Sequence, residues 1–189
     1  MSQEKESKAL DSKNRKNNNF FTKEIYHIIK RINLMSQTDI NNIYIYPFIG
    51  QLRRFIFSHK VHSPEVPREK FRHLRRNKET FETKTDGTYD LISHKKNFFN
   101  SGYQVSFETK FDSYSDEEYE EIAYKMALMS DNRVYLGVYD STPEISFHFN
   151  DFELAKALSI VFNQNSIWDW SKNDIIRNNY YKEKGKILL

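Results

Sequence analysis

The stretch Gly102-Tyr-Gln-Val-Ser-Phe-Glu108 begins the part of the sequence that decides the fold, which continues to Trp170. In these first residues Tyr103, Val105 and Phe107 alternate with polar side chains. A period of two is expected where one face of a strand is buried and the other is not. The stretch therefore opens with a predicted β-strand.

A helix is predicted next, beginning at Ser115-Asp-Glu-Glu118. In this capping-box pattern the serine oxygen accepts from the third helical N–H, and the glutamate accepts from the N–H of the serine. Apolar residues then recur at steps of three and four, which predicts one buried face. The apolar residues are Tyr119, Ile122, Ala123, Met126 and Met129. The opposite side is expected to face solvent and carries Glu117, Glu120, Glu121 and Lys125.

A β-hairpin and a second helix are predicted after this. Val134–Tyr139 and Ile145–Phe149 both alternate, and Asp140-Ser-Thr-Pro143 between them has turn composition. Asn150 is a candidate N-cap for the second helix, and Ser166–Trp170 reads as a short aromatic strand. The apolar stripe of the second helix consists of Leu154, Ala155, Leu158, Val161 and Phe162.

The resulting order, strand–helix–strand–strand–helix–strand, predicts an α+β domain of the ferredoxin-like type with both helices on one sheet face. The alternation places Tyr135, Tyr139 and His148 on the other, open face if the aliphatic residues point to the helices. The reverse register would bury them. The acidic surroundings disfavour a stacking platform for nucleic acid, and we interpret this face as a protein-binding or merely half-buried surface. Glu117, Glu120 and Glu121 are included in the same predicted surface.

Composition restricts the class of protein. The chain has 189 residues, of which 38% are hydrophobic and 29% are charged, as in soluble globular proteins. It has no cysteine, which excludes disulfides, thiolate nucleophiles and cysteine-ligated zinc. There is no apolar run of about 20 residues, and the polar start Met1–Lys5 does not read as a signal peptide. We therefore expect a cytoplasmic protein.

Charge divides the sequence into two unlike halves. Residues 1–100 hold 20 Lys and Arg against 11 Asp and Glu, whereas residues 101–189 hold 9 against 15. A basic front half and an acidic back half predict either two surfaces with different partners or the docking of one half on the other.

Five segments follow from composition and periodicity. Residues 1–19 read as a polar tail, residues 20–85 as a basic helical region, and residues 86–100 as a linker. Residues 101–178 form the ferredoxin-like domain and residues 179–189 a C-terminal tail. The basic region is expected to be a separate unit, with helical apolar spacing in Phe20–Leu34 and again in Phe48–Phe57.

The most basic segment runs from His59 to Lys78, and Pro67 predicts a helix from there to Arg76. Its cations could neutralise a nucleic-acid backbone. The alternatives are an ordinary solvated helix face, or docking on the acidic helix at Glu117–Glu121. The candidate nucleic-acid-binding residues are Arg53, Arg54, Lys60, Arg68, Arg72, Arg75, Arg76 and Lys78.

No catalytic or metal site is predicted with a recognisable spacing. The histidines His59, His62, His73 and His94 match no standard zinc pattern. Carboxylates near the strand ends could meet as an acid/base pair or hold a divalent ion, although caps and turns account for most such residues. There is no Gly-x-Ser-x-Gly and no phosphate-binding glycine loop, so no cofactor is expected. The carboxylates are Asp112, Asp116, Asp140, Glu144 and Asp151.

A resemblance covers residues 100–178 and rests on four segments. Gly102-Tyr-Gln-Val-Ser, Val134-Tyr-Leu-Gly-Val-Tyr, Glu144-Ile-Ser-Phe and Asn163-Gln-Asn-Ser-Ile-Trp-Asp169 resemble a pattern in small accessory proteins of phages, plasmids and integrative elements of low-GC bacteria. Such proteins often carry Gly-Tyr-x-Val-Ser and a late Asn-x-Gln-x-Ala-Ile-x-Asp, and this chain has Ser166 where alanine is common. The resemblance implies a host-interaction, element-maintenance or anti-defence role.

Three hypotheses follow. The first is a non-enzymatic protein of a mobile genetic element that binds a host or element protein. The second is a DNA- or RNA-binding accessory protein that uses residues 53–78. The third and weaker one is a metal-dependent nuclease built on the strand-end carboxylates. The outer edge of the predicted sheet also leaves pairing with a second copy open.

Overall fold

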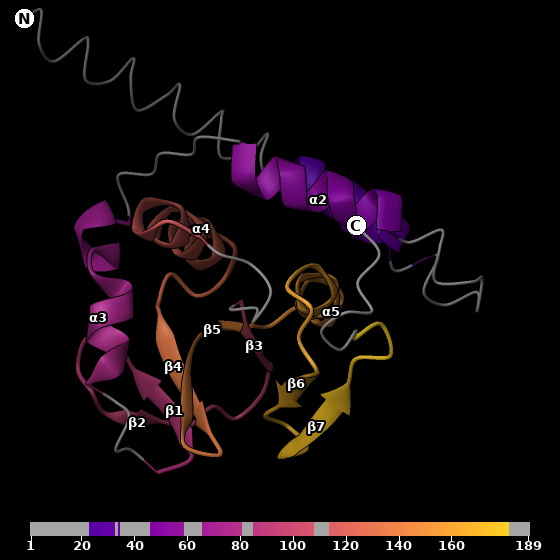
Figure 1. Ribbon diagram of the computed structural model, residues 1–189. Helices are drawn as coiled ribbons and strands as arrows, with labels where there is room; N and C mark the ends of the chain where they lie inside the picture. The colour runs from indigo at the N-terminus through magenta and orange to yellow at the C-terminus, as the bar shows by residue number, and fades with distance from the viewer. Residues whose placement is uncertain are drawn as a thin grey trace, which may run out of the picture.

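An antiparallel sheet of seven strands, in the order β2-β1-β4-β5-β3-β6-β7, forms the base of the molecule (Figure 1). The computed structural model describes residues 23–32, 34, 46–58, 66–80, 85–107 and 114–181. The predicted α+β class is confirmed. The strands are β1 (Gly87–Asp90), β2 (Lys96–Asn97), β3 (Tyr103–Ser106), β4 (Tyr135–Tyr139), β5 (Thr142–Phe149), β6 (Ser166–Asp169) and β7 (Asp174–Arg177).

Three of these strands were not expected from sequence. β1 and β2 lie within residues 86–100, so the interpretation of this segment as a linker is wrong. β1 pairs antiparallel with β4, and Leu91 after it is buried. β7 extends the other edge by pairing with β6. The segment between the two predicted halves is therefore part of the sheet.

The predicted hairpin is present, with β4 and β5 as adjacent antiparallel partners. Its turn is shorter than expected, because Asp140 and Ser141 alone make the reversal. Both have positive φ, of 48° and 59°, as a two-residue type I′ turn requires. Pro143 belongs to β5, where it lies opposite Val138.

Two helices, α4 (Asp116–Met129) and α5 (Phe152–Val161), cover one face of the sheet (Figure 1). The capping box is confirmed: the N–H of Glu118 donates to Ser115 Oγ over 3.2 Å, and the N–H of Ser115 donates to Glu118 Oε2 over 2.9 Å. The predicted cap of α5 is wrong by one residue. Asp151, not Asn150, accepts the backbone N–H groups of the first turn.

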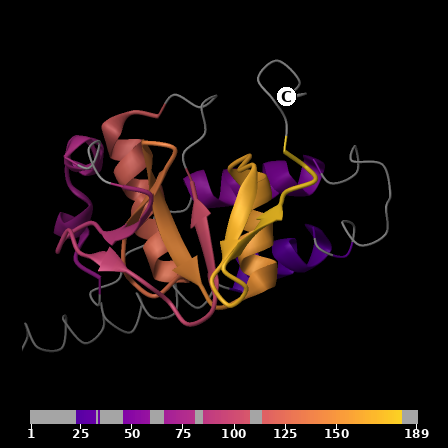
Figure 2. The ribbon, with the colours of Figure 1, turned by 90° about the horizontal axis from the view of Figure 1, so that it is seen from below.

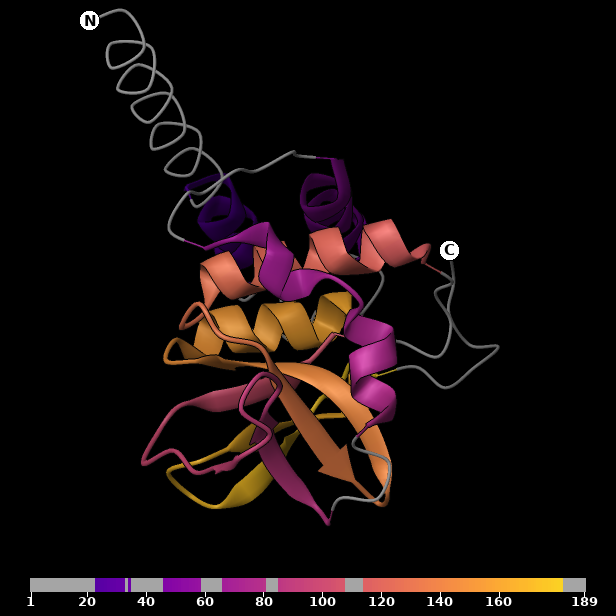
Figure 3. The ribbon, with the colours of Figure 1, turned by 90° about the vertical axis from the view of Figure 1, so that its left-hand side faces the viewer.

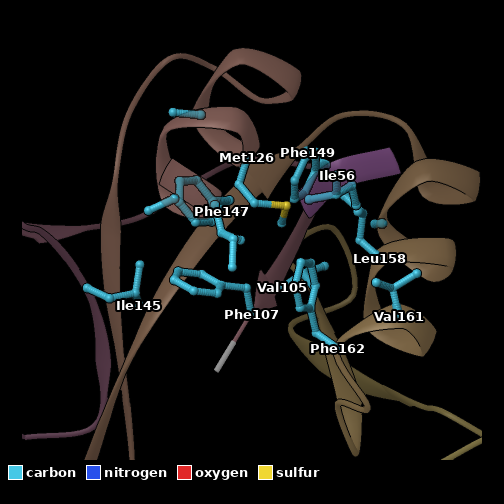
Figure 4. Packing of buried hydrophobic residues seen from close by; sticks show 14 of the residues in the cluster. Ile56, Val105, Phe107, Met126, Ile145, Phe147, Phe149, Leu158, Val161 and Phe162 are labelled. Carbon is cyan, nitrogen blue, oxygen red and sulfur yellow. The ribbon is translucent and has the colours of Figure 1, made fainter. Parts of the chain in front are cut away.

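The hydrophobic core lies between the sheet and these helices (Figure 4). Its sheet side consists of the inward-pointing residues of β3 and β5 and of Phe107, and its helix side of the apolar stripes of α4 and α5. Figure 4 labels Ile56, Val105, Phe107, Met126, Ile145, Phe147, Phe149, Leu158, Val161 and Phe162. Ile56 comes from the basic N-terminal region, so this region contributes to the same core.

A third layer covers the helices. The helical segment 23–32 and α2 (Tyr46–Ser58) lie side by side across α4 and α5, on the side away from the sheet (Figure 3). Seen from below, the strands lie in front of α4 and α5, and the outer helices lie behind them (Figure 2). The prediction of a separate N-terminal unit is therefore wrong. The buried residues of the outer layer are Ile25, Ile29, Ile32, Ile49, Leu52 and Ile56.

This third layer changes the surroundings of α4. Lys125, predicted to face solvent, is only 1% exposed, and its ammonium group donates to the carbonyl oxygen of Ile56 near the end of α2. It also lies 3.5 Å from the carboxylate of Glu121. Burial lowers the pKa of Lys125. The solvent-facing assignment of this lysine is wrong because α2 covers that side of α4.

The sheet face opposite the helices is only partly open. The ring of Phe99 stacks on His148 with 3.9 Å between centroids, and it meets Tyr135 and Trp170 edge-on, each at 5.2 Å. Tyr135 and His148 are buried beneath it, so their expected exposure is wrong. Tyr139, at the end of β4, is 79% exposed. The segment after β2 thus closes the part of this face that the sequence left open.

Candidate functional site

The basic segment is folded as two short pieces, η2 (Arg68–Phe71) and α3 (Leu74–Glu79), and not as the single helix predicted. The break lies at His73, whose φ of 59° is left-handed and incompatible with a continuing helix. Pro67 precedes the first piece, as its fixed φ favours. Phe71 and Leu74 are buried, which holds both pieces against the domain.

Ionic contacts join these two pieces to α4. Arg68 Nη1 lies 2.6 Å from Glu121 Oε2, and its guanidinium stacks over the ring of Tyr124 at 4.7 Å. The backbone N–H of His73 donates to Glu120 Oε1 over 2.6 Å. Arg68 and Glu121 thus form an ion pair, the contact of His73 is a hydrogen bond to a carboxylate, and the planar guanidinium of Arg68 gains further from the aromatic face.

Arg75 makes a similar set of contacts at the start of the same helix. Its Nη2 donates to the carbonyl oxygen of Tyr114 over 2.8 Å, and its Nε lies 3.5 Å from Asp116. Its guanidinium lies 4.6 Å from the ring centre of Tyr119. Of the alternatives derived from sequence, docking of the basic segment on the acidic helix is the one observed. Arg68, Arg75, Glu120 and Glu121 thus have intramolecular partners.

The remaining predicted site residues are dispersed. Arg72, Arg76 and Glu117 are exposed, whereas Arg53 and Lys78 are half-buried. Lys60, His59, His62 and Asp112 lie outside the described residues. Tyr139 is exposed at the tip of the hairpin, away from the buried Tyr135 and His148. The structure does not bring the predicted protein-binding residues together into one surface.

The concave feature of interest is a groove in the outer layer, with a volume of about 560 Å³. We call it the outer groove. One wall consists of Glu24, His27, Ile28 and Arg31 of segment 23–32. The other wall consists of Gln51, Arg54, Phe55 and Ser58 of α2. Each wall uses the positions i, i+3, i+4 and i+7, which form one face of a helix.

The outer groove opens away from the core, because the buried isoleucines and leucine of both helices occupy their inner faces. Ile28 and Phe55 are half-buried and supply its apolar part. Arg31 and Arg54 are exposed and supply positive charge, and Glu24 is half-buried. The guanidinium of Arg31 lies 5.9 Å from the ring centre of Phe48. This contact puts the end of segment 23–32 beside the start of α2, so the two helices run antiparallel.

The strand-end carboxylates are used for local structure. Asp116 pairs with Arg75, Asp151 caps α5, and Asp140 lies in the hairpin turn. Glu144 lies in β5. Within the described part of the chain, no group of three or more His, Asp or Glu side chains is arranged to hold a metal ion. The carboxylate cluster expected from sequence is thus not assembled among these residues.

Sequence reasoning missed the outer groove, although one signal for it was present. The sequence predicts helices in residues 20–34 and 48–57, and its spacing puts Phe48, Leu52, Phe55 and Ile56 on one face of the second helix. The structure instead buries Ile49, Leu52 and Ile56 and leaves Phe48 and Phe55 half-buried. A helix with more apolar residues than one buried face needs is a signal of a second contact surface.

Comparisons with protein-family models, with curated proteins and with solved structures find no match to this chain. In the described part of the chain, no helix has the length and apolar character needed to span a membrane. The function is therefore inferred from the residues of the chain itself.

Proposed function

We propose that this protein is a non-enzymatic accessory protein of a phage or another mobile genetic element, and that it binds a host or element protein in the cytoplasm. The observation that carries the proposal is the outer groove, which is lined by two half-buried apolar residues and by polar and charged ones. Protein-recognition grooves combine these features, since apolar contacts supply affinity and the rim supplies specificity. The resemblance in residues 100–178 supports the mobile-element setting and an anti-defence or host-interaction role.

We also propose a ferredoxin-like core formed by β3-α4-β4-β5-α5-β6. The strand order β4-β5-β3-β6 in the middle of the sheet supports this, because the two βαβ halves of that fold interleave in the same way. On this proposal β1, β2 and β7 are additions at the two edges, and the helical layer of segment 23–32 and α2 is an addition over the helices.

The position of the outer groove supports a recognition role over a structural one. Its two helices bury their inner faces, and Ile28 and Phe55 also pack against that core. Both side chains are nevertheless only half-buried, so part of each stays accessible in the outer groove. Such apolar area on an outermost surface, rimmed by polar residues, is characteristic of an interaction site.

The experiment compares two tryptophan substitutions of equal bulk. Gln51→Trp fills the outer groove, whereas Lys30→Trp places the same ring on an exposed position that does not line it. Tagged protein is incubated with nuclease-treated extract of a low-GC bacterial host, and retained proteins are identified by mass spectrometry. We expect a protein retained by wild type and by Lys30→Trp to be lost with Gln51→Trp. Equal retention by all three, or loss of all partners on nuclease treatment, would contradict the proposal.

Nucleic-acid binding is a second candidate function, which the exposed Arg72 and Arg76 favour. These residues are four apart and belong to the basic segment, while Arg68 and Arg75 are engaged with α4. A gel-shift salt series on wild type and on the Arg72→Ala, Arg76→Ala double variant tests it. Phosphate contacts would give affinity that falls steeply with salt, and the double variant would reduce the salt slope by about 2. No shift at low salt eliminates this candidate.

A further inference from the structure

We infer that the outer groove binds an acidic amphipathic α-helix of a partner protein. This inference rests on the proposed protein-binding function and goes beyond it by naming the shape and chemistry of the partner. It is carried by three properties of the outer groove: the antiparallel, side-by-side placement of its two wall helices, the position of its apolar residues, and the sign of its charge.

The walls have the shape that a helix requires. Each wall spans eight residues, from Glu24 to Arg31 and from Gln51 to Ser58, which corresponds to roughly 10 Å of helix axis. Because the two wall helices are antiparallel and side by side, the lining residues extend over about two helical turns on each side of the groove. A third helix laid along it would complete a three-helix arrangement, as in helix-in-groove recognition.

The apolar residues lie where anchors of such a helix would reach. Ile28 and Phe55 occupy the same i+4 position on their own walls, one on each side of the groove. An apolar stripe at i, i+3, i+4 and i+7 on the incoming helix would place its side chains against both. The volume of about 560 Å³ accommodates a few aliphatic side chains.

Charge complementarity determines the polar residues of the partner. Arg31 and Arg54 line the groove on opposite walls and are exposed. Their guanidinium groups match carboxylates that flank an apolar stripe. Lys23 and Lys30, also exposed, add positive charge on the outer side of the first wall. Glu24 is the negative residue of the groove and lies at the end opposite Arg31.

A nucleic-acid occupant fits these observations less well. A phosphate backbone would use Arg31 and Arg54 but would make no apolar contact with the accessible parts of Ile28 and Phe55, which otherwise pack against the core. It would also approach the carboxylate of Glu24, which repels phosphate. An acidic helix uses both the cations and the apolar pair.

The test uses three defined probes with the full-length chain. The first is a helical peptide of about 14 residues with leucine at the anchor positions and glutamate on the flanks. The second has lysine in place of every glutamate, and the third is duplex DNA. We expect the acidic peptide to bind in a fluorescence-anisotropy titration, at least tenfold more tightly than the lysine peptide. No binding of the acidic peptide, or equal binding of both peptides, overturns the inference.

Two charge-matched variants locate the binding. Arg31→Glu with Arg54→Glu reverses the charge inside the outer groove, and Lys23→Glu with Lys30→Glu makes the same change in net charge outside it. We expect the two substitutions inside the groove to lower the affinity for the acidic peptide at least tenfold. The two substitutions outside it should lower this affinity less than threefold. Equal weakening by both pairs would show a general charge effect and overturn the inference, as would duplex DNA that competes with the peptide.

The outcome for this inference is separable from that of the proposed function. If the acidic peptide fails to bind but Gln51→Trp still abolishes capture of a host protein, the groove is a protein-binding site for another kind of partner. If neither the peptide nor any host protein depends on the groove, both proposals fail.

Discussion

Removal of the buried Lys125 gives the sharpest test of how the outer helices pack on the domain. Truncation to alanine deletes three buried carbons of the side-chain stem, which together stabilise the fold by about 2 kcal/mol. It also leaves the carbonyl oxygen of Ile56 without its donor, at a cost of about 1–3 kcal/mol. That oxygen lies in the last turn of α2, where carbonyl groups have no partner within the helix.

Burying the ammonium group costs free energy, and the substitution removes this cost, which offsets part of the two losses above. We therefore expect Lys125→Ala to lower the free energy of unfolding by about 2–4 kcal/mol. Lys125→Met keeps a stem of similar length and removes the buried charge. It is expected to stay within about 1 kcal/mol of wild type. Glu121 keeps its contact with Arg68 in both variants. The control is Lys30→Ala, which alters an exposed lysine and is expected to cost less than about 1 kcal/mol.

The assay is urea unfolding followed by circular dichroism, repeated at several pH values. Because burial lowers the pKa of Lys125 below its usual 10.5, the folded protein releases this proton before the unfolded chain does. Wild type should therefore gain stability relative to Lys125→Met as the pH rises through the folded-state pKa towards 10.5. A Lys125→Ala variant as stable as wild type would refute the burial of this lysine under α2. If Lys125→Met were as unstable as Lys125→Ala, this would refute the expectation that removing the buried charge offsets the loss of the hydrogen bond to Ile56.

Three further predictions concern the domain itself. Gly102→Ala should lower the free energy of unfolding by about 2–4 kcal/mol, because φ is +93° and the added methyl group would overlap the ring of His148. A loss smaller than about 1 kcal/mol would contradict the close packing of His148 on Gly102. Ser115→Ala should cost about 1 kcal/mol by removing the cap of α4, with no change in the denaturant m-value. The Tyr135 hydroxyl donates to Asp131 over 2.6 Å, and burial raises its pKa, so stability should fall above pH 10 as the unfolded chain ionises. Tyr135→Phe should abolish that part of the pH dependence, and an unchanged profile would contradict the assignment.

The elements that sequence predicts well are those whose signal is local. The strand at Tyr103, the hairpin between Val134 and Phe149, and the capping box at Ser115 are recognised from alternation, turn composition and a four-residue pattern. Each depends on neighbours in the chain, and each is present in the structure.

The elements that sequence misses depend on distant packing. β2 has two residues, Lys96 and Asn97, which is too short for any periodicity, and its place is set by pairing with β1. Sequence predicts that Lys125 faces solvent, because it is charged and lies on the polar side of the predicted helix. It is buried because α2 covers that side of α4. Phe99 is one of two adjacent phenylalanines in a segment without periodicity, and only the structure shows that it closes the sheet face over His148.

The candidate site shows the same division. The basic segment and the acidic helix were recognised as complementary from their charges, but the individual pairs Arg68–Glu121 and Arg75–Asp116 are visible only in three dimensions. The outer groove arises from two helices that sequence predicts separately and whose antiparallel placement it does not provide. Sequence therefore identifies the helices and their charge, and only the structure shows the outer groove between them.

The central claim is that the outer groove is the surface through which this protein binds another protein. Photocrosslinking in host cells tests it most directly, with a benzophenone amino acid placed at Gln51 in the groove and, separately, at Lys30 outside it. The account predicts a discrete crosslinked protein band from position 51 and none from position 30. Crosslinking of position 51 to nucleic acid alone, or identical bands from both positions, would contradict it.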